Sequence, residues 1–253
     1  MRHFHTLSMA TVVAVLGCAG AQTKSPVVTH SDEGKSTSPS GDSAAKRGTS
    51  FVRFVNALPG DSGLAVSAEK KDLFGNVAFK AVTPYVETTD NLATFVLRTP
   101  GNVNEMATNT ETMSDGYRYT LVALSNRKGG AALRVLRDEL VTNAGKARIR
   151  IIHAASGTAE VDVAVQGERD ALFASIGYAN DAGFKEVDPA TVTFDIRRDK
   201  GGSRLVRLPK MTMSAGRAYT IILTGTGPGK LSAIVFDDAV TPGAPTVAME
   251  RPR

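Results

Sequence analysis

The sequence predicts an all-β protein: two tandem antiparallel β-sandwich domains of the immunoglobulin-like kind, which follow a disordered tether. Short stretches rich in Val, Ile, Phe and Thr alternate with Gly, Pro, Asn and Asp, as in proteins built from short strands and tight turns. One such stretch occurs twice, and each copy begins a segment of about a hundred residues. A duplicated segment of that size is typical of a sandwich repeated in tandem.

The duplicated stretch comprises residues 51–57 and residues 147–154, and each copy is an apolar run interrupted by arginine, Arg53 in the first and Arg148 and Arg150 in the second. Asn56 and His153 occupy matching places in the two copies, 97 residues apart. Further along the chain the separation of matching residues grows only to 100. Small loop insertions within one fold explain so small a change in the separation of matching residues. The pattern indicates duplication of a whole domain.

Composition divides the chain into five segments. They are a signal peptide (1–17), a lipidated cysteine with a disordered linker (18–50), a first β-sandwich repeat (51–143), a second repeat (144–241) and a flexible tail (242–253). The linker is dominated by Ser, Thr, Gly, Lys and Asp, and so few apolar residues cannot form a core.

Apolar runs and turn residues place the strands of the first repeat. We expect strands near residues 51–57, 63–68, 74–79, 92–98, 117–125 and 132–138. The polar stretch 102–114 has no clear period, and it is predicted to be a long loop. Alignment of the repeats predicts that Phe95 and Phe194 occupy equivalent core positions, and that Tyr119 and Tyr219 do so too.

The amino terminus combines a basic residue, a short apolar run and the single cysteine of the chain. Arg2 precedes the apolar residues 9–17, a run far shorter than the roughly 20 residues that span a bilayer. Residues 15–18, ending at Cys18, resemble the bacterial lipobox, although Val15 and Leu16 depart from its commonest residues. The resemblance implies that Cys18 is acylated; a plain secretory signal with a chance cysteine is the alternative.

Lipidation of Cys18 would place the folded repeats outside the cytoplasmic membrane. Ala19 rather than aspartate follows the cysteine, and by resemblance to lipoprotein sorting signals this favours the outer membrane. Whether the protein faces the periplasm or the cell surface stays open, as does its oligomeric state.

A family resemblance rests on the second repeat. Its motifs are residues 148–154, 161–163, Phe173, 177–178 and 216–220, and together they resemble the family called domain of unknown function 4397. The resemblance implies an extracytoplasmic bacterial β-sandwich-like domain, often lipidated and often in tandem, and it implies no activity. The chain departs from the family pattern at residues 156–158, and at Asn56 the first repeat lacks the histidine.

The distribution of charge argues against nucleic acid as a partner. The formal net charge is +5, Trp is absent, and basic and acidic residues are interleaved along both repeats. A nucleic-acid-binding surface would gather basic residues beside aromatic side chains.

His153 is the one histidine within the repeats, and a metal site or a hydrolase site could use it. A metal site needs three or four ligands, and with no cysteine or second histidine nearby only Glu160 and Asp162 could join it. No G-x-S-x-G motif supplies a nucleophile for a serine hydrolase. We therefore expect no metal and no cofactor, and we interpret His153 as a strand-end imidazole hydrogen-bonded to backbone, a role that Asn56 can share.

Acidic pairs follow the last strand of each repeat, Asp138-Glu139 in the first and Asp237-Asp238 in the second. The alignment matches Asp138 with Asp237. Carboxylate pairs serve glycoside hydrolysis or calcium binding, but neighbours on a strand point to opposite faces. The pairs are interpreted as solvated strand ends.

A basic hairpin tip in the second repeat is the remaining candidate site. Arg197, Arg198, Lys200 and Arg204 are candidate anion-binding residues for lipid headgroups or an acidic polymer, against the alternative of plain solvation.

The sequence thus predicts a membrane-anchored extracytoplasmic lipoprotein whose tandem modules are non-catalytic and serve a binding or structural role in the cell envelope. Its expected partners are the membrane, through the lipid, and an envelope protein or polymer. The alternative is an extracytoplasmic hydrolase that uses carboxylates near strand ends.

Overall fold

The computed structural model describes residues 48–60, 62–69, 71–138 and 143–237. The predicted signal peptide, Cys18, almost all of the predicted linker and the predicted tail 242–253 lie outside these residues. Within the described ranges the only helical element is a single 3-10 turn, η1 (Pro228–Lys230). No helix in this part of the chain is long and apolar enough to cross a membrane.

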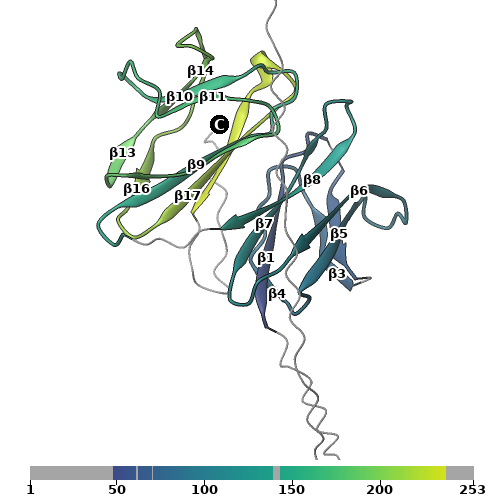
Figure 1. Ribbon diagram of the computed structural model, residues 1–253. Helices are drawn as coiled ribbons and strands as arrows, with labels where there is room; N and C mark the ends of the chain where they lie inside the picture. The colour runs from purple at the N-terminus through teal and green to yellow at the C-terminus, as the bar shows by residue number, and fades with distance from the viewer. Residues whose placement is uncertain (1–47, 61, 70, 139–142, 238–253) are drawn as a thin grey trace, which may run out of the picture. The chain divides into compact units, whose positions relative to one another are not determined.

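The first repeat forms two four-stranded sheets (Figure 1). Its strands are β1 (Ser50–Asn56), β2 (Leu64–Ala68), β3 (Lys71–Val77), β4 (Val86–Thr88), β5 (Leu92–Arg98), β6 (Glu105–Thr112), β7 (Arg118–Ser125) and β8 (Ala131–Asp138). We call the sheet with order β4-β1-β7-β8 inner sheet 1, and the sheet with order β3-β2-β5-β6 outer sheet 1. Their facing sides enclose one hydrophobic core.

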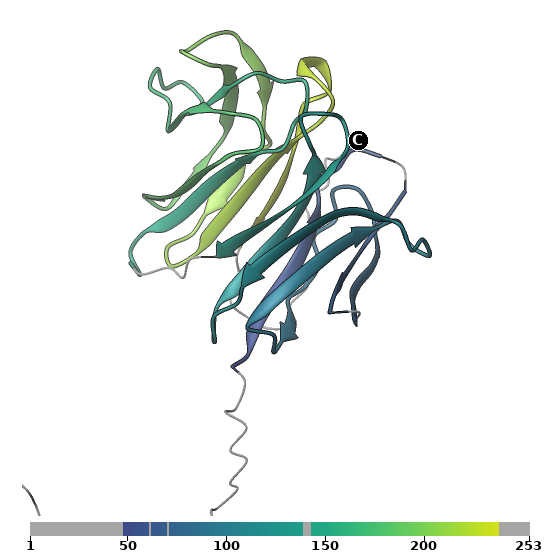
Figure 2. The same ribbon diagram turned by 45° about the vertical axis from the view of Figure 1, so that its right-hand side comes forward.

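The second repeat is built in the same way (Figure 2). Its strands are β9 (Ala147–His153), β10 (Val161–Val165), β11 (Phe173–Ile176), β12 (Asp181–Val187), β13 (Ala190–Val192), β14 (Phe194–Arg198), β15 (Arg204–Arg207), β16 (Met211–Met213), β17 (Ala218–Thr224) and β18 (Ser232–Asp237). Inner sheet 2 has the order β12-β9-β17-β18, and outer sheet 2 has the order β11-β10-β14-β15. Strands β13 and β16 form a small additional ladder. The predicted pair of all-β sandwiches is confirmed.

Pairing is antiparallel except at one place in each repeat. β1 lies parallel to β7, and β9 lies parallel to β17. The paired strands are separated along the chain by most of a repeat, and only a long connection allows parallel neighbours. The first strand of each repeat thereby becomes a central strand of its inner sheet.

The prediction of a long loop over residues 102–114 was wrong. Residues 105–112 form β6, an edge strand that pairs with β5 along its whole length. Its side chains alternate between exposed and half-buried, and Thr94 and Thr110 share a 2.9 Å hydrogen bond across the ladder. An edge strand with a solvated face contains few apolar residues, which explains why the hydrophobic pattern did not reveal it.

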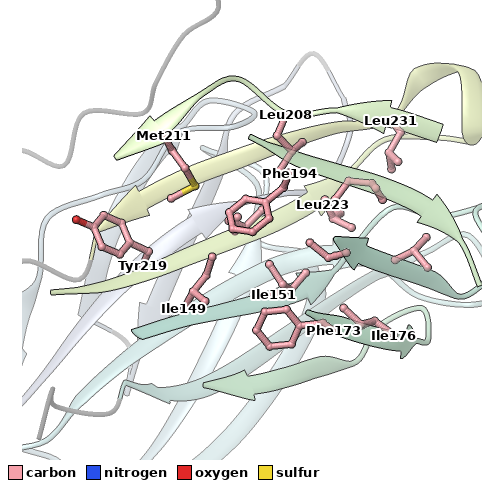
Figure 3. Packing of buried hydrophobic residues seen from close by; sticks show 14 of the residues in the cluster. Ile149, Ile151, Phe173, Ile176, Phe194, Leu208, Met211, Tyr219, Leu223 and Leu231 are labelled. Atoms are coloured by element: carbon pink, nitrogen blue, oxygen red, sulfur yellow. The ribbon is translucent and has the colours of Figure 1, made fainter. Parts of the chain in front are cut away.

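The two cores hold equivalent aromatic residues, as predicted. Phe95 and Phe194 are both fully buried. Figure 3 shows the core of the second repeat, where the ring of Phe194 lies near the side chains of Leu208 and Met211. The ring of Phe173, from β11, lies beside Ile151 at the other side of the same cluster (Figure 3).

The matched tyrosines make the same hydrogen bond. The hydroxyl of Tyr119 accepts from the backbone N–H of Ser114, and that of Tyr219 accepts from Ser214, at 2.9 Å in both cases. Each tyrosine ties the loop before the central strand to the core, as in the tyrosine corner of immunoglobulin-like sandwiches.

Backbone conformation repeats as faithfully as the side chains. Asn76 and Ser175 have φ of 49° and 52°, and Lys80 and Ala179 have φ of 68° and 63°. Both pairs are 99 residues apart. Left-handed φ is uncommon for residues other than glycine. Agreement at both of these positions therefore indicates that the corresponding loops of the two repeats share one conformation.

The inner sheets of the two repeats pack against each other through their remaining faces. A third apolar cluster contains residues of both repeats: Val55, Ala57, Val122, Leu124 and Leu136 from the first, with Ile152, Ala154, Ile222, Ile234 and Phe236 from the second. The hydroxyl of Thr224 also donates to the carbonyl of Ala57 at 2.7 Å. Burial on both sides explains why β7 and β17 are almost continuously apolar.

Candidate functional site

A buried polar centre lies where the inner sheets meet, and it starts from the arginines of the duplicated stretch. Arg53 donates from Nε to the hydroxyl of Thr120, and Arg150 donates from Nε to that of Thr220, at 2.9 Å in both repeats. Both arginines are at most 3% exposed. The duplication therefore preserved an arginine–threonine pair between the two central strands of each inner sheet.

An aromatic ring covers each of these guanidinium groups. Tyr85 lies 4.7 Å from the Arg53 guanidinium carbon, and Phe184 lies 4.7 Å from that of Arg150. Phe236, which belongs to the second repeat, lies 4.4 Å from Arg53 on the first. Such contacts with the faces of aromatic rings stabilise a cation that has lost most of its water.

Asp138 joins the two arginines across the repeats. Its carboxylate accepts a hydrogen bond from Arg150 Nη2, and it lies 3.7 Å from Arg53 Nη2. The hydroxyls of Thr120 and Tyr85 donate to the same carboxylate at 2.7 Å and 2.6 Å. With four neighbours that stabilise negative charge, this buried carboxylate is held ionised.

The pKa of Asp138 is lowered despite its burial. Desolvation alone would raise this pKa, but the positive charges of Arg150 and Arg53 lower it, and the hydrogen bonds from Tyr85 and Thr120 lower it further. Asp138 is 5% exposed, so the interpretation of this residue as a solvated strand end was wrong. The reason is a contact with the other repeat, which strand geometry alone does not reveal.

The predicted match between Asp138 and Asp237 was also wrong, by one residue. Tyr119 pairs with Arg137 in the first repeat, and the equivalent Tyr219 pairs with Asp237 in the second. The ladders therefore make Asp237 the counterpart of Arg137. Asp237 is about a third exposed and forms a 3.2 Å ion pair with Arg217, while Glu139 and Asp238 lie outside the described residues.

Both ring nitrogens of His153 form hydrogen bonds with backbone groups, as predicted. Its Nε2 lies 3.1 Å from the carbonyl of Ala159, and its Nδ1 accepts from the N–H of Ala155 at 3.3 Å. This geometry fixes the neutral tautomer with hydrogen on Nε2. Burial lowers the pKa of His153, against smaller effects of the backbone bonds to Ala159 and Thr158, which raise it. The imidazole also makes a T-shaped contact with the ring of Tyr178.

Asn56 makes the corresponding bonds in the first repeat. Its side-chain oxygen accepts from the N–H of Leu58, two residues on, just as His153 accepts from Ala155. Its amide nitrogen donates to the carbonyl of Val77 at 2.9 Å. One structural role is therefore filled by two residue types.

The four basic residues of the hairpin between β14 and β15 have different surroundings in the structure. Arg197 turns back over the protein and donates to the carbonyls of Glu168 and Arg169, at 2.9 Å and 3.3 Å. Arg198 and Arg204 are exposed, and Lys200, at the tip, has 89% of its side chain exposed. Only three of the four candidate residues thus present charge to solvent.

Two aspartates on outer sheet 2 accept hydrogen bonds from residues in or near the same hairpin. Asp195 binds Arg207 through both oxygens, at 2.8 Å and 3.2 Å, and this hydrogen bonding lowers the pKa of Asp195. Asp162 accepts from the N–H groups of Ser175 and Gly201, both at 2.8 Å. Asp162 is therefore engaged with backbone rather than grouped with His153 and Glu160. In the described part of the chain, no three His, Cys, Asp or Glu side chains are grouped as a metal site.

Sequence reasoning did not identify the buried polar centre. The available signal was an arginine inside an apolar run, present in both copies of the duplicated stretch, with a threonine at matching places in β7 and β17. A charge at such a place needs a buried partner. The partner could not be found from sequence because Asp138, at the end of β8, reaches Arg53 and Arg150 only where the inner sheets of the two repeats meet.

The fold and this centre define a class: an all-β chain with two duplicated sandwiches joined by a shared polar core. The chain belongs to the family described as domain of unknown function (DUF4397), whose model matches residues 50–164 and 150–249. No curated protein matches the sequence.

Solved structures resemble parts of the fold. The C-terminal domain of AlgF from P. aeruginosa is 18% identical, with a TM-score of 0.29, over 37% of this chain and 98% of that domain. A family CBM26 module of Eubacterium rectale Amy13K, solved with maltoheptaose, is 15% identical, with a TM-score of 0.24, over 78% of this chain and 98% of that module. Scores this low carry no functional argument.

Proposed function

We propose that this protein is a lipid-anchored, extracytoplasmic member of its family, whose tandem sandwiches serve a non-catalytic binding or structural role in the cell envelope. In this proposal Cys18 carries the lipid, and the Ser- and Thr-rich linker separates the sandwiches from the bilayer. By the coil relation of about 5–6 Å × √n, some thirty residues reach roughly 30 Å.

The observation that carries the non-catalytic assignment is the commitment of the reactive side chains. His153 holds two backbone groups through its two nitrogens, so neither nitrogen is available to a nucleophile. Asp138 is ionised between two buried arginines and is not exposed to a substrate. Both side chains are therefore engaged in contacts within the protein.

The basic hairpin tip supports the proposed binding role. Arg198, Lys200 and Arg204 project charge from one tip, and Lys200 has only a 4.0 Å contact with Asp199. Such a tip can hold a headgroup or an acidic polymer at low ionic strength.

Fractionation of cells that express the full chain tests the anchor. Cys18→Ser should abolish fatty-acid labelling and move the protein to the soluble fraction, and retained labelling would refute the anchor. The non-catalytic role is tested by a broad hydrolase screen of the purified chain together with capture of partners from envelope extract. Turnover that His153→Ala abolishes would overthrow the proposal, whereas a stable partner without turnover supports it.

A further inference from the structure

A small cavity opens at one side of the second sandwich, between the edges of its two sheets. It has a volume of about 290 Å³ and is lined from β11, from β12 and from the turn between them. Its polar side chains are those of Ser175, Asn180, Asp181 and Lys185. This volume is at the lower end of the range of ligand sites, roughly 300–1,000 Å³, which suits a single small ring.

Two irregular strand segments shape the cavity. The pairing of β11 with β10 shifts register between Val161 and Val163, where Ser175 adopts its left-handed φ. The pairing of β12 with β9 shifts beyond Asp181, where Gly183 has φ of 67°. Bulges on sheet edges redirect side chains and are frequent beside binding sites.

Three of these polar side chains have no polar counterpart in the first repeat, and only Ser175 has one, in Asn76. Residues 99 apart are equivalent over this segment, as the matching left-handed positions and the matching aromatic rings over the two arginines establish. At that separation the three equivalents of Asn180, Asp181 and Lys185 are apolar. They are Ala81, Val82 and Val86. The second repeat thus has three polar groups at positions where the first repeat forms the same backbone with apolar residues.

These groups differ in what they offer a ligand. The Lys185 ammonium donates one bond to the carbonyl of Leu172 at 2.6 Å, which leaves further N–H groups for a ligand. The Asp181 carboxylate forms a 3.1 Å ion pair with Arg134, so its charge is balanced while accepting capacity remains. The Asn180 amide makes no hydrogen bond to the described residues, and it can both donate and accept.

We infer that this cavity binds a sugar ring through its hydroxyl groups. A hydroxyl both donates and accepts, so neighbouring hydroxyls can serve a donor-only ammonium, an acceptor-only carboxylate and an amide together. A ligand such as acetate only accepts hydrogen bonds, so it offers no donor to Asp181, and it would be repelled by Asp199, whose carboxylate lies 2.5 Å from the Ser175 hydroxyl. An apolar ligand would leave these polar atoms without partners.

This inference rests on the proposed binding role and names its ligand class. The sugar comes from one of two sources, a neutral glycan or an acidic one, and both present the same ring hydroxyls. Saturation-transfer NMR of the purified full chain would test them separately. The neutral probes are glucose, galactose and N-acetylglucosamine, the acidic probe is glucuronate, and acetate and inorganic phosphate serve as anion controls.

The decisive variant gives the second repeat two residues of the first: Asn180→Ala with Lys185→Val, which leaves the Asp181–Arg134 ion pair intact. We expect saturation transfer to at least one sugar, with affinity lowered at least about tenfold in this variant. The matched control is Asn91→Ala with Lys128→Val, at exposed positions of the first repeat, and it should bind as the parent does. Thermal unfolding of both variants checks that each remains folded.

Three results would overturn the inference: no transfer to any of the sugars, transfer only to acetate or phosphate, or sugar binding that survives the double substitution. These results are distinct from a failure of the proposed function, which would appear as enzymatic turnover or as a protein without envelope partners.

Discussion

The two repeats agree at the centre of their inner sheets and differ along one edge of those sheets, at β4 and β12. Arg53 and Arg150 make the same bond to a threonine and lie under equivalent rings. At this edge, by contrast, the half-buried Val86 of the first repeat corresponds to the exposed Lys185 of the second. Duplicated positions that agree are those that hold the fold, and positions that diverge are where a function specific to one copy is to be sought.

The largest expected effect comes from the polar centre. Asp138→Asn removes the negative charge that two buried arginines share, and we expect the free energy of unfolding to fall by about 3–5 kcal/mol. Asp237→Asn, in the second repeat, breaks a surface ion pair and should cost less than about 1 kcal/mol. Urea denaturation of both variants measures the difference, and equal losses would contradict the central place given to Asp138.

The next effect should be the same in both repeats. Tyr119→Phe and Tyr219→Phe each leave the N–H of a serine without its hydrogen-bond acceptor, at Ser114 and Ser214. Each change should lower the free energy of unfolding by about 1–2 kcal/mol. Urea midpoints of the two variants compare the sites, and a loss confined to one repeat would show that the tyrosines are not equivalent.

A smaller effect distinguishes the hairpin residues. Arg197→Ala should lower the free energy of unfolding by about 1 kcal/mol, because Arg197 donates to two carbonyls. Its counterpart in the first repeat, Arg98, donates to Ser67 and Glu105, and its replacement by alanine should cost a similar amount. Lys200→Ala at the exposed tip should stay within about 0.5 kcal/mol of the parent in thermal unfolding. A large loss for Lys200→Ala would mean that the tip is structural.

The smallest effect concerns His153. His153→Asn adopts the residue that the first repeat uses at this place, so at pH 8 the free energy of unfolding should change by less than about 1 kcal/mol. The pH dependence should change more clearly. Because burial lowers the pKa of His153 in the folded chain, the unfolded chain binds a proton first as the pH falls below the ordinary value of 6.5.

The parent should therefore lose stability as the pH falls from about 7 towards 5, and His153→Asn should flatten this part of the profile. Below about pH 4 both proteins should lose stability alike, because the lowered pKa of Asp138 means that its contribution is present above 3.8 and is lost as the pH falls through the folded value. Melting temperatures across this range measure both effects. An unchanged slope between pH 7 and 5 would exclude His153 as the titrating group.

The fold could be predicted from sequence because strand, turn and repeat are local or periodic signals. The run of β7 indicated a central strand, and the matched phenylalanines and tyrosines were found by alignment alone. β6 was missed since an edge strand has no apolar face to detect. The burial of Asp138 was missed because it depends on Arg150, which reaches it only when the two repeats pack together.

The cavity lay beyond sequence reasoning for another reason. Asn180, Asp181 and Lys185 look like ordinary surface residues in the chain, and only the register of β12 against β9 and the bulge of β11 bring them to one opening. Comparison with the apolar residues of the first repeat shows that these three polar residues are specific to the second. That comparison needs the structural equivalence of the two loops.

The packing of inner sheet 1 on inner sheet 2 has a consequence for how the molecule melts. Neither repeat can unfold alone without exposing the apolar face of the other and leaving Asp138 or its arginines without their counter-charges. The two sandwiches are therefore thermodynamically coupled, and heat should unfold them in one cooperative calorimetric transition, although each encloses a core of its own.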